Sequence, residues 1–334
     1  MVGKAGSTIY DVADKASVSI TTVSRFLNSP ALVNELTAGK IQDAMDALAY
    51  IPHGNSGTVA KRQIGRVGVL APFFTAPSFV QRIQGMTQVL RQANTELVVY
   101  SVDNPEQLDE YLQSVPFTKR LDGLIILSMA LNEKQIHRLE RTAIQVVLVE
   151  QSHPGFSCIE IDNVQGGRLA AEYVLKRGLL PAAFVGEQTV SPFSLHPSDL
   201  RWKGFSEVLQ AAGHPVRPEH VVLGEGKVED ASRLALELLN RPHRPRSVFA
   251  MSDLMAIGAL RSARSLGLAI PHELAILGFD DIEAASWMEL STVSQDLGES
   301  GRLAAGLLLE HIRDPKLPKK LTRLGLKIIE RSTT

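Results

Sequence analysis

The sequence predicts an α/β protein in two parts: a small all-helical domain at the N-terminus, then a large domain of parallel strands and helices. In the opening segment, apolar residues recur at helical spacing. From residue 64 onward, short apolar runs alternate with helical stretches, as in parallel sheets covered by helices. The 334 residues are long enough for two or three domains with sizeable cores.

The composition is that of an ordinary soluble protein, with 44% hydrophobic and 21% charged residues. No run approaches about 18 apolar residues, so we expect no transmembrane helix and no membrane partner. The N-terminus has no continuous apolar stretch of the kind that a secretory signal needs. Cys158, the single cysteine, cannot form an intrachain disulfide, which fits a buried thiol in a reducing, cytoplasmic compartment.

The first and third helices of the opening segment are predicted from their boundary signals. Thr8-Ile9-Tyr10-Asp11 is a capping-box pattern, and it is followed by apolar residues at helical spacing over 9–16. A tight turn is expected at residues 17–18. Another helix is expected to open after Asn34 and to end before Ile51-Pro52, because the residue before a proline disfavours helix.

The stretch between them, SVSITTVSRFLN, is rich in β-branched residues that favour a strand. However, Ile20, Val23 and Leu27 fall at i, i+3 and i+7, which predicts a helix that begins after Ser19. Two short helices joined by a tight turn, with a third behind, make a helix-turn-helix unit, whose second helix enters the DNA major groove. A face of threonines and serines with one arginine suits contacts with base edges.

The alternative is a small helical cap whose polar face is merely solvated. Charge does not decide between the two interpretations, because residues 1–62 hold six basic and five acidic side chains, a net charge of +1. This is a weak electrostatic footprint for a DNA-binding domain. The net charge of the whole chain, −1, gives no further indication of a polyanionic partner.

The large domain is predicted from seven apolar runs that read as buried parallel strands: RVGVLAP, ELVVYSV, DGLIILS, IQVVLVE, AAFVGE, RSVFAMSD and ELAILGFDD. Helices are expected over 80–93, 166–177, 203–212, 228–240, 254–266 and 298–313. Such sheets bind ligands beyond the carboxyl ends of their strands, where polar residues collect: Ser128, Glu150, Asp162, Ser252, Asp253 and Asp280. Carboxylates there can accept hydrogen bonds from neighbouring sugar hydroxyls.

Several motifs together resemble the lactose-repressor/galactose-repressor (LacI/GalR) family. They are TIYDVADKASVSITTVSRFLNS, then VNELT from Val33, LAYIP from Leu48, and IIERST near the C-terminus. The resemblance covers nearly the whole chain. It implies a homodimeric transcription regulator, most often a repressor, that binds a pseudo-palindromic double-stranded DNA operator and is controlled by a small-molecule effector.

The resemblance also implies DNA contacts. Ile20, Thr21 and Arg25 match the base-reading positions of the recognition helix. Positions that touch phosphates or neighbouring groups are matched by Thr8, Ser24, Asn28, Thr37 and Tyr50. For Tyr50, packing in the core is an equal alternative.

The family's next element is a hinge that becomes helical on DNA and inserts a leucine into the minor groove. Here it spans residues 53–63, with His53, Ser56 and Val59 as candidate contacts. Val59 replaces the family's leucine and is a shorter wedge. Gly54 and Gly57 each disfavour helix by about 1 kcal/mol relative to alanine. We therefore expect a hinge that is disordered off DNA and kinks the duplex less.

The large domain resembles the family's effector domain, which is similar to type I periplasmic sugar-binding proteins: two Rossmann-like lobes that the chain crosses three times. The implied domains are 1–52, the hinge 53–63 and 64–334. The first lobe takes about 64–160 plus 293–325, and the second about 161–292 plus 326–334. The implied effector contacts are Ser78, Phe79, Asp162, Arg201, Ser252, Asp253 and Asp280. Asp162 could instead cap the following helix, and Phe79 could instead pack in the core.

Two other classes of protein fit less well. For an enzyme, GEGKVED lacks the Walker spacing, and no Ser-His-Asp arrangement or metal-ligand cluster stands out, so we expect neither cofactor nor metal. A periplasmic solute receptor is disfavoured by the helix-turn-helix and by the missing signal peptide. The chain has no C-terminal heptad tail, from which we expect a dimer rather than a tetramer. Whether the effector releases DNA or promotes binding is not readable from the residues.

Overall fold

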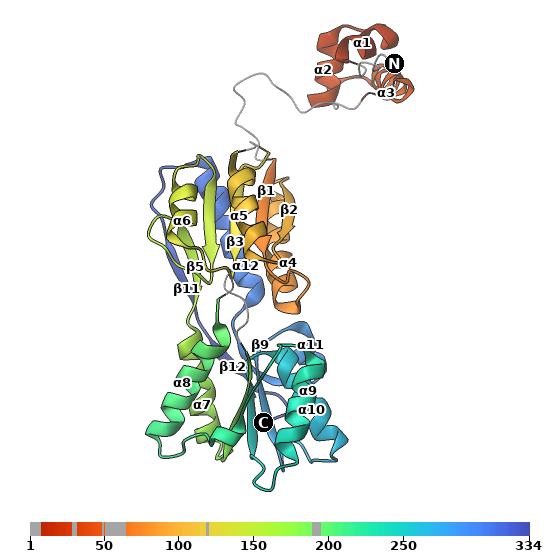
Figure 1. Cartoon of the computed structure of the whole chain (residues 1–334). Helices are drawn as coiled ribbons and strands as arrows, with labels where there is room; N and C mark the ends of the chain where they lie inside the picture. The colour runs from red at the N-terminus through yellow and green to blue at the C-terminus, as the bar shows by residue number, and fades with distance from the viewer. Residues whose placement is uncertain (1–7, 29–31, 49, 51–64, 118–119, 189–194) are drawn as a thin grey trace. The chain divides into compact units, whose positions relative to one another are not determined.

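The computed structural model describes residues 8–28, 32–48, 50, 65–117, 120–188 and 195–334. The chain divides into two compact units, 1–63 and 64–334, and we call the first the headpiece and the second the effector unit (Figure 1). Among the described residues, no helix is long and apolar enough to span a membrane.

The headpiece consists of three helices: α1 (Ile9–Ala16), α2 (Ile20–Asn28) and α3 (Glu35–Ala47). They enclose a small core whose fully buried members include Val12, Val23 and Ile41. The capping box of α1 is formed as the sequence predicts, and Ser17 makes the turn to α2 in a left-handed conformation with φ 54°. Leu36 is 84% exposed, because the buried side of this helix is carried by Ile41, Ala44 and Met45.

The helix α2 forms although its β-branched residues favour a strand. Its start is stabilised by Ser19, whose hydroxyl accepts a hydrogen bond from the Thr22 N–H at 3.1 Å. Val23 is completely buried against the other two helices, and Phe26 and Leu27 pack beside it. Burial of these side chains therefore outweighs the local propensity, which spans only about 1 kcal/mol per residue.

The effector unit contains two six-stranded sheets, one in each lobe. The first sheet is entirely parallel, in the order β11-β5-β4-β3-β1-β2. Its strands are β1 (Arg66–Ala71), β2 (Glu96–Ser101), β3 (Gly123–Leu127), β4 (Gln145–Val149), β5 (Ser157–Ile161) and β11 (Leu321–Leu324).

The second sheet has the order β12-β10-β9-β8-β6-β7, and all its pairs are parallel except β12 with β10. Its strands are β6 (Ala182–Glu187), β7 (Val221–Gly224), β8 (Ser247–Ala250), β9 (Ala275–Asp280), β10 (Ser291–Ser294) and β12 (Lys327–Ile329).

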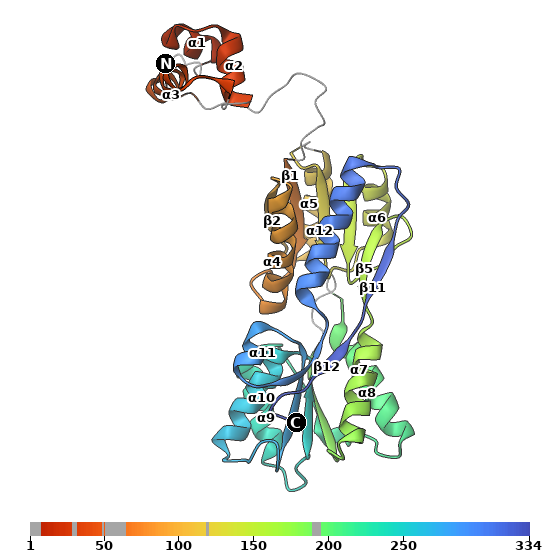
Figure 2. The ribbon, with the colours of Figure 1, turned by 180° about the vertical axis from the view of Figure 1, so that it is seen from behind.

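Helices cover both faces of each sheet (Figures 1 and 2). In the first lobe, α4 (Pro77–Gln92) and α12 (Leu297–Arg313) share one apolar cluster, while α5 (Pro105–Ser114) and α6 (Glu133–Glu140) share the other. The helices of the second lobe are α7 (Asn163–Lys176), α8 (Pro197–Ala211), α9 (Val228–Leu239), α10 (Asp253–Ser265) and the short α11 (Glu283–Trp287). This layering produces the buried strands that the apolar runs predict.

The chain passes between the lobes three times, after β5, after β10 and after β11 (Figure 2). All four residues of β10 pair within the second sheet, with β9 and β12. The second crossing therefore follows Ser294, and the expected lobe boundary at residue 293 is displaced because it would cut through a hydrogen-bonded strand.

Two helix pairs cross so closely that only glycine fits at the contact. A Cβ atom at Gly301 of α12 would lie 1.9 Å from the Arg82 carbonyl oxygen of α4, and one at Gly85 would lie 2.1 Å from the Gly298 carbonyl oxygen. In the second lobe, Gly167 and Gly204 make the same kind of contact between α7 and α8. These crossings set the positions of the helices that carry Arg82 and Arg201.

Candidate DNA-binding surface and effector cavity

The headpiece presents the polar face of α2 to solvent. Thr21 and Arg25 are exposed, and so is the apolar Ile20, at 42%, whereas Val23 faces the core. The three residues expected to read bases therefore share the accessible side of one helix. Such a helix offers an arginine for guanine edges and a short hydroxyl that permits close approach.

The residues expected to contact phosphates are placed around this helix. Thr8 caps α1, and its hydroxyl and N–H both donate to Asp11 at 2.7 Å, which lowers the pKa of the Asp11 carboxyl. Ser24 is half-buried on α2, and Asn28 is the last residue of that helix. Thr37 lies in the first turn of α3 and donates its N–H to the Asn34 side chain at 2.8 Å.

Tyr50 is half-buried against the headpiece core, and its N–H donates to the Met45 carbonyl at 2.9 Å. This placement corresponds to the alternative interpretation of Tyr50 as a packing residue. The hinge candidates His53, Ser56 and Val59 lie outside the described residues.

A cavity of about 550 Å³ lies between the two lobes of the effector unit, at the carboxyl ends of the strands. Five of the residues expected to contact an effector line it: Ser78, Phe79, Arg201, Ser252 and Asp280. Asp162 and Asp253 do not. The sequence prediction missed Arg82, Glu187, His196 and Gln295, which also line the cavity.

The side chain of Asp253 is completely buried and serves the framework of the second lobe. Its Oδ1 accepts a hydrogen bond from the Thr292 hydroxyl at 2.6 Å, and its Oδ2 accepts one from the Ile282 N–H at 2.8 Å. Burial raises the pKa of Asp253 well above its usual range, and Asp280 adds to the rise. The carboxyl group therefore ties β10 to the loop after β9.

Asp162 also has a role in the framework of the second lobe. Its side chain accepts a hydrogen bond from the Gln165 N–H at 2.9 Å and caps the start of α7. This is the alternative that the sequence left open. A carboxylate at this position satisfies a free N–H and faces the positive end of the helix dipole.

A chain of polar contacts joins the two lobes across the cavity wall. In the first lobe, Arg82 forms an ion pair with Glu150, which also accepts a hydrogen bond from the Ser128 hydroxyl. Arg82 Nη2 also donates to Gln295 Oε1 at 2.8 Å, and Gln295 Nε2 donates to Asp280 Oδ1 at 2.6 Å. Gln295 lies where the chain crosses between lobes, so it connects a first-lobe arginine to a second-lobe carboxylate.

Arg201 completes the second-lobe side of this wall. Its Nε donates to Asn163 at 2.9 Å, and its Nη1 donates to the Met251 carbonyl and lies 3.6 Å from Asp280 Oδ1. The guanidinium also stacks 3.5 Å from the ring centre of Phe279. Arg201 is therefore held in one orientation before any effector is present, which favours selective binding.

Burial and neighbouring charges determine the ionisation of these groups. Burial raises the pKa of Asp280 to about 6, against the opposing effects of Arg201 and Arg82. For Glu150, burial alone would raise the pKa, but the charge of Arg82 and the Ser128 hydrogen bond lower it overall. Glu150 thus carries its charge at neutral pH, while Asp280 gains or loses its proton near pH 6.

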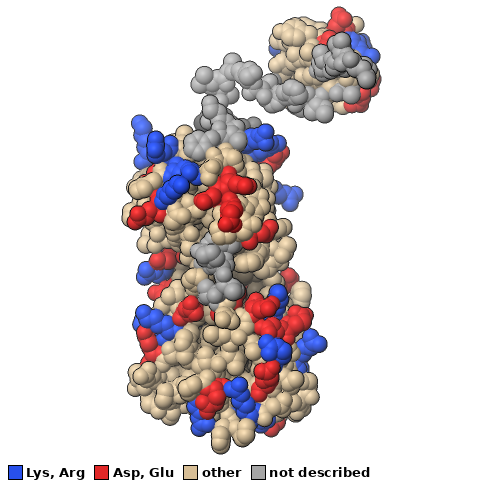
Figure 3. All heavy atoms as spheres, in the orientation of Figure 1, with Lys and Arg blue, Asp and Glu red and all other residues tan. Residues whose placement is uncertain are grey.

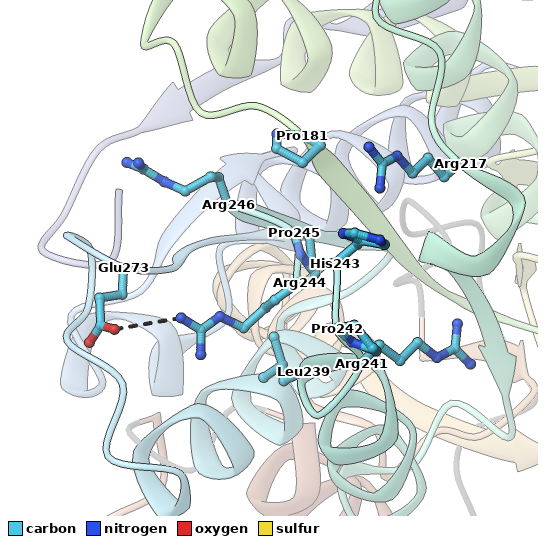
Figure 4. A pocket seen from close by; sticks show the side chains of 10 residues that line it. All are labelled: Pro181, Arg217, Leu239, Arg241, Pro242, His243, Arg244, Pro245, Arg246 and Glu273. Carbon is cyan, nitrogen blue, oxygen red and sulfur yellow. Dashed lines mark ion pairs between the residues drawn. The ribbon is translucent and has the colours of Figure 1, made fainter.

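A second hollow, of about 490 Å³, lies at the amino ends of β6 and β8 (Figure 4). Four arginines line it, but Arg241 and Arg244 extend in opposite directions in Figure 4. Arg244 pairs with Glu273 at 3.5 Å, and Arg241 donates to the Glu219 carbonyl. Because these side chains diverge, the hollow lacks the convergent groups of a ligand site, in contrast to the cavity between the lobes.

For the described residues, neither the charges on the face seen in Figure 3 nor the metal-binding residue types indicate a further site. Acidic and basic side chains are interspersed on the face of the effector unit seen in Figure 3. The described residues contain no group of three His, Cys, Asp or Glu side chains placed to hold a metal ion. Cys158 is buried, and burial raises the pKa of its thiol, as expected for an unreactive core cysteine.

Two family models match the chain. Residues 8–53 match "Bacterial regulatory proteins, lacI family", and residues 171–334 match "Periplasmic binding protein-like domain". The first match covers the headpiece helices, and the second covers most of the second lobe together with α12 and β11.

The chain is similar to curated relatives and to solved structures, in several cases over nearly its whole length. The ribose operon repressor of Escherichia coli K12 is 28% identical over 98% of this chain and 99% of its own. The repressor PurR of Photorhabdus laumondii is 29% identical over 97% and 96%. A structure of the Lac repressor superposes with a TM-score of 0.80 at 25% identity, over 99% of this chain and 100% of that one. A structure of a LacI family regulator from Enterococcus faecium with bound ribose superposes with a TM-score of 0.70 at 25% identity, over 80% of this chain and 98% of that one.

These relatives are transcriptional regulators. The Lac repressor structure spans both the helical headpiece and the two-lobed domain described above. The chain therefore carries a DNA-binding domain of the lacI family at its N-terminus and a periplasmic binding protein-like domain after it.

Proposed function

We propose that the protein is a cytoplasmic transcriptional repressor that binds a pseudo-palindromic operator as a homodimer and is controlled by a sugar in the cavity between its lobes. It carries out no catalytic reaction in this role. One observation carries the proposal: a single chain joins a helix-turn-helix with an exposed polar face to a cavity whose polar wall is built from both lobes.

The headpiece supplies DNA recognition. Arg25 and Thr21 contact base edges from α2, with Ile20 against the apolar edge of a base. The backbone contacts come from Thr8, Ser24, Asn28 and Thr37, which hold the helix in register, and from Tyr50 and the hinge residues His53, Ser56 and Val59. A dimer places two such headpieces on two half-sites.

The cavity supplies control. An effector in contact with Ser78, Phe79 and Arg82 of the first lobe and Arg201, Ser252 and Asp280 of the second stabilises one relative position of the lobes. It changes operator binding only to the extent that it binds one state of the protein more tightly than the other. A sugar fits because carboxylates, hydroxyls and arginines in the wall complement its hydroxyl groups, and because a similar regulator has been solved with bound ribose.

The DNA half of the proposal is tested by selecting binding sites from random duplex DNA with the full-length protein, with and without sugars. A palindromic site should be enriched; if none is, the proposal is wrong. On the selected site, Arg25→Ala should relax base preference at one position in each half-site and cost about 1–3 kcal/mol of binding free energy. Unchanged base preference would remove Arg25 from sequence readout.

The effector half is tested by thermal unfolding in the presence of sugars, sugar phosphates and nucleobases. A ligand that binds only the folded state raises the melting temperature with its concentration. Arg201→Ala should abolish that rise, and the same ligand should change operator affinity of the wild type in either direction. An undiminished response in Arg201→Ala would refute the role of this side chain.

A further inference from the structure

We infer that the cavity selects an uncharged sugar over its phosphorylated form, and that Glu187 makes this selection by accepting hydrogen bonds from sugar hydroxyls. The inference rests on the proposed function, because it concerns the effector of the same cavity. It adds a specificity-determining residue that the sequence did not single out.

The cationic side chains of the cavity wall are already neutralised. Among the described residues, three lysines or arginines line the cavity, and each lies beside a carboxylate that also lines it. Arg82 pairs with Glu150, Arg201 lies 3.6 Å from Asp280, and Lys227 lies 2.8 Å from Glu225. An anionic effector would have to displace one of these carboxylates to obtain a charged partner.

Two further carboxylates of the wall, Glu187 and Glu229, remain after this pairing. Glu229 is exposed in the first turn of α9, whereas Glu187 is half-buried at the carboxyl end of β6. Within the part of the chain that the structure describes, Glu187 forms no ion pair. The neighbouring segment 189–194 reads TVSPFS and contains no basic residue.

The backbone around Glu187 leaves its carboxylate accessible from the cavity. Gly226, which also lines the cavity, has φ +76°, and a Cβ atom there would lie 2.9 Å from Glu187 Oε1. Burial raises the pKa of Glu187, although Arg201 and His196 oppose the rise. A half-buried carboxylate that forms no ion pair is destabilised by desolvation, and donors from a ligand relieve this.

The cavity wall also offers hydrogen-bond donors to a ligand. The helices α8 and α9 begin at the cavity, at His196 and Lys227, and neither is capped by a side chain. Pro197, the first residue of α8, has no N–H, but the N–H groups that follow it and the first ones of α9 can donate to ligand oxygens. A sugar hydroxyl accepts from such an N–H and donates to Glu187 at the same time. A phosphate dianion only accepts, so beside Glu187 it meets like charge and supplies no donor.

The test uses the full-length protein with ribose, glucose, galactose and fructose, each beside its monophosphate ester, and measures dissociation constants by calorimetry after a thermal-shift screen. The sugar with the largest shift should bind at least about tenfold more tightly than its monophosphate. Glu187→Gln should weaken the binding of that sugar by about tenfold, which is the order expected for a lost hydrogen bond to a charged group. It should also reduce the preference for the sugar over its monophosphate. Glu229→Gln, the matched control on the exposed rim, should change neither constant more than about twofold.

The outcomes separate this inference from the proposed function. Tighter binding of a monophosphate, or an unchanged affinity in Glu187→Gln, overturns the inference while sugar control stands. If neither the sugars nor the esters bind, the proposed effector class fails and the inference fails with it. Glu187→Gln should unfold at the same temperature as the wild type without ligand, because no ion pair is lost. Glu187→Asp, which keeps the charge on a shorter side chain, should bind with intermediate affinity.

Discussion

Gly301→Ala should destabilise the effector unit through a single methyl group. The added Cβ would lie 1.9 Å from the Arg82 carbonyl oxygen and 3.1 Å from the Met86 N. Both contacts are with the backbone of α4, which cannot turn away as a flexible side chain could. The helices α4 and α12 must therefore separate by roughly 1 Å, in a core that is close-packed.

The expected magnitude follows from two opposing terms. Overpacking of this kind destabilises by about 1–3 kcal/mol, while replacing glycine by alanine inside a helix stabilises by about 1 kcal/mol. Gly306 is the matched control, because it lies on the same helix and a Cβ there meets nothing within 4 Å. Since the propensity gain is common to both variants, the difference between them isolates the overpacking term.

Thermal unfolding of the wild type, Gly301→Ala and Gly306→Ala, followed by circular dichroism, measures that difference. In a unit of this size about 1 kcal/mol corresponds to roughly 2–4 °C, so Gly301→Ala should unfold several degrees below Gly306→Ala. Its response to an effector should also weaken, because Arg82 moves with α4. A Gly301→Ala protein as stable as Gly306→Ala would refute the close crossing.

Three other predictions concern separate parts of the molecule. Ile41→Ala, in the headpiece core, should lower the unfolding free energy of the headpiece by about 2–5 kcal/mol. Operator binding in a gel-shift assay should then be abolished, while the effector still raises the melting temperature of the effector unit. Retained DNA binding would contradict the packing of the headpiece core. The pKa of Asp280 is about 6 in the folded protein, above the ordinary value of 3.8 that applies to the unfolded chain. Its contribution to the unfolding free energy is therefore complete below about pH 4 and is lost as the pH rises to 6. The difference in unfolding free energy between wild type and Asp280→Asn should therefore change across that window and be constant above it; a flat difference would contradict the assigned pKa. Asp253→Asn should lower the unfolding free energy by about 1–3 kcal/mol, because one of the two donors from Thr292 and Ile282 then faces an amide N–H₂. The effector affinity of the folded variant should not change. A large loss of effector affinity, measured by calorimetry, would place Asp253 in the effector site.

Much of the secondary structure could be predicted from neighbouring residues. The headpiece helices, the seven apolar strands and the six long helices of the large domain were predicted from patterns that lie within one turn or one strand. Other elements were not predicted, because they are short or polar. The strand β10 has four residues, β12 has three, and the eight-residue α6 reads EKQIHRLE, so their periodicity is weaker than that of a buried element.

The cavity was predicted less completely than the fold. Ser78, Phe79, Arg201, Ser252 and Asp280 line it, as the resemblance implied. Asp162 and Asp253 occur in the expected motifs but point into the protein framework. The position of a carboxylate after a strand indicates which end of the sheet it occupies, while its direction depends on neighbours from other strands.

The sequence by itself determined the helix-turn-helix, the alternation of strands and helices, and the cap that starts α1, because these depend on hydrogen bonds and apolar spacing within about four residues. The tertiary structure alone decided which charges meet. Arg82 and Gln295 are 213 positions apart in the chain, yet they share a hydrogen bond of 2.8 Å. Such a contact depends on how two sheets and the crossing chain segments pack together. For the same reason, Glu187 is an ordinary residue at the end of a strand in the sequence and a half-buried carboxylate in a cavity wall in the folded protein.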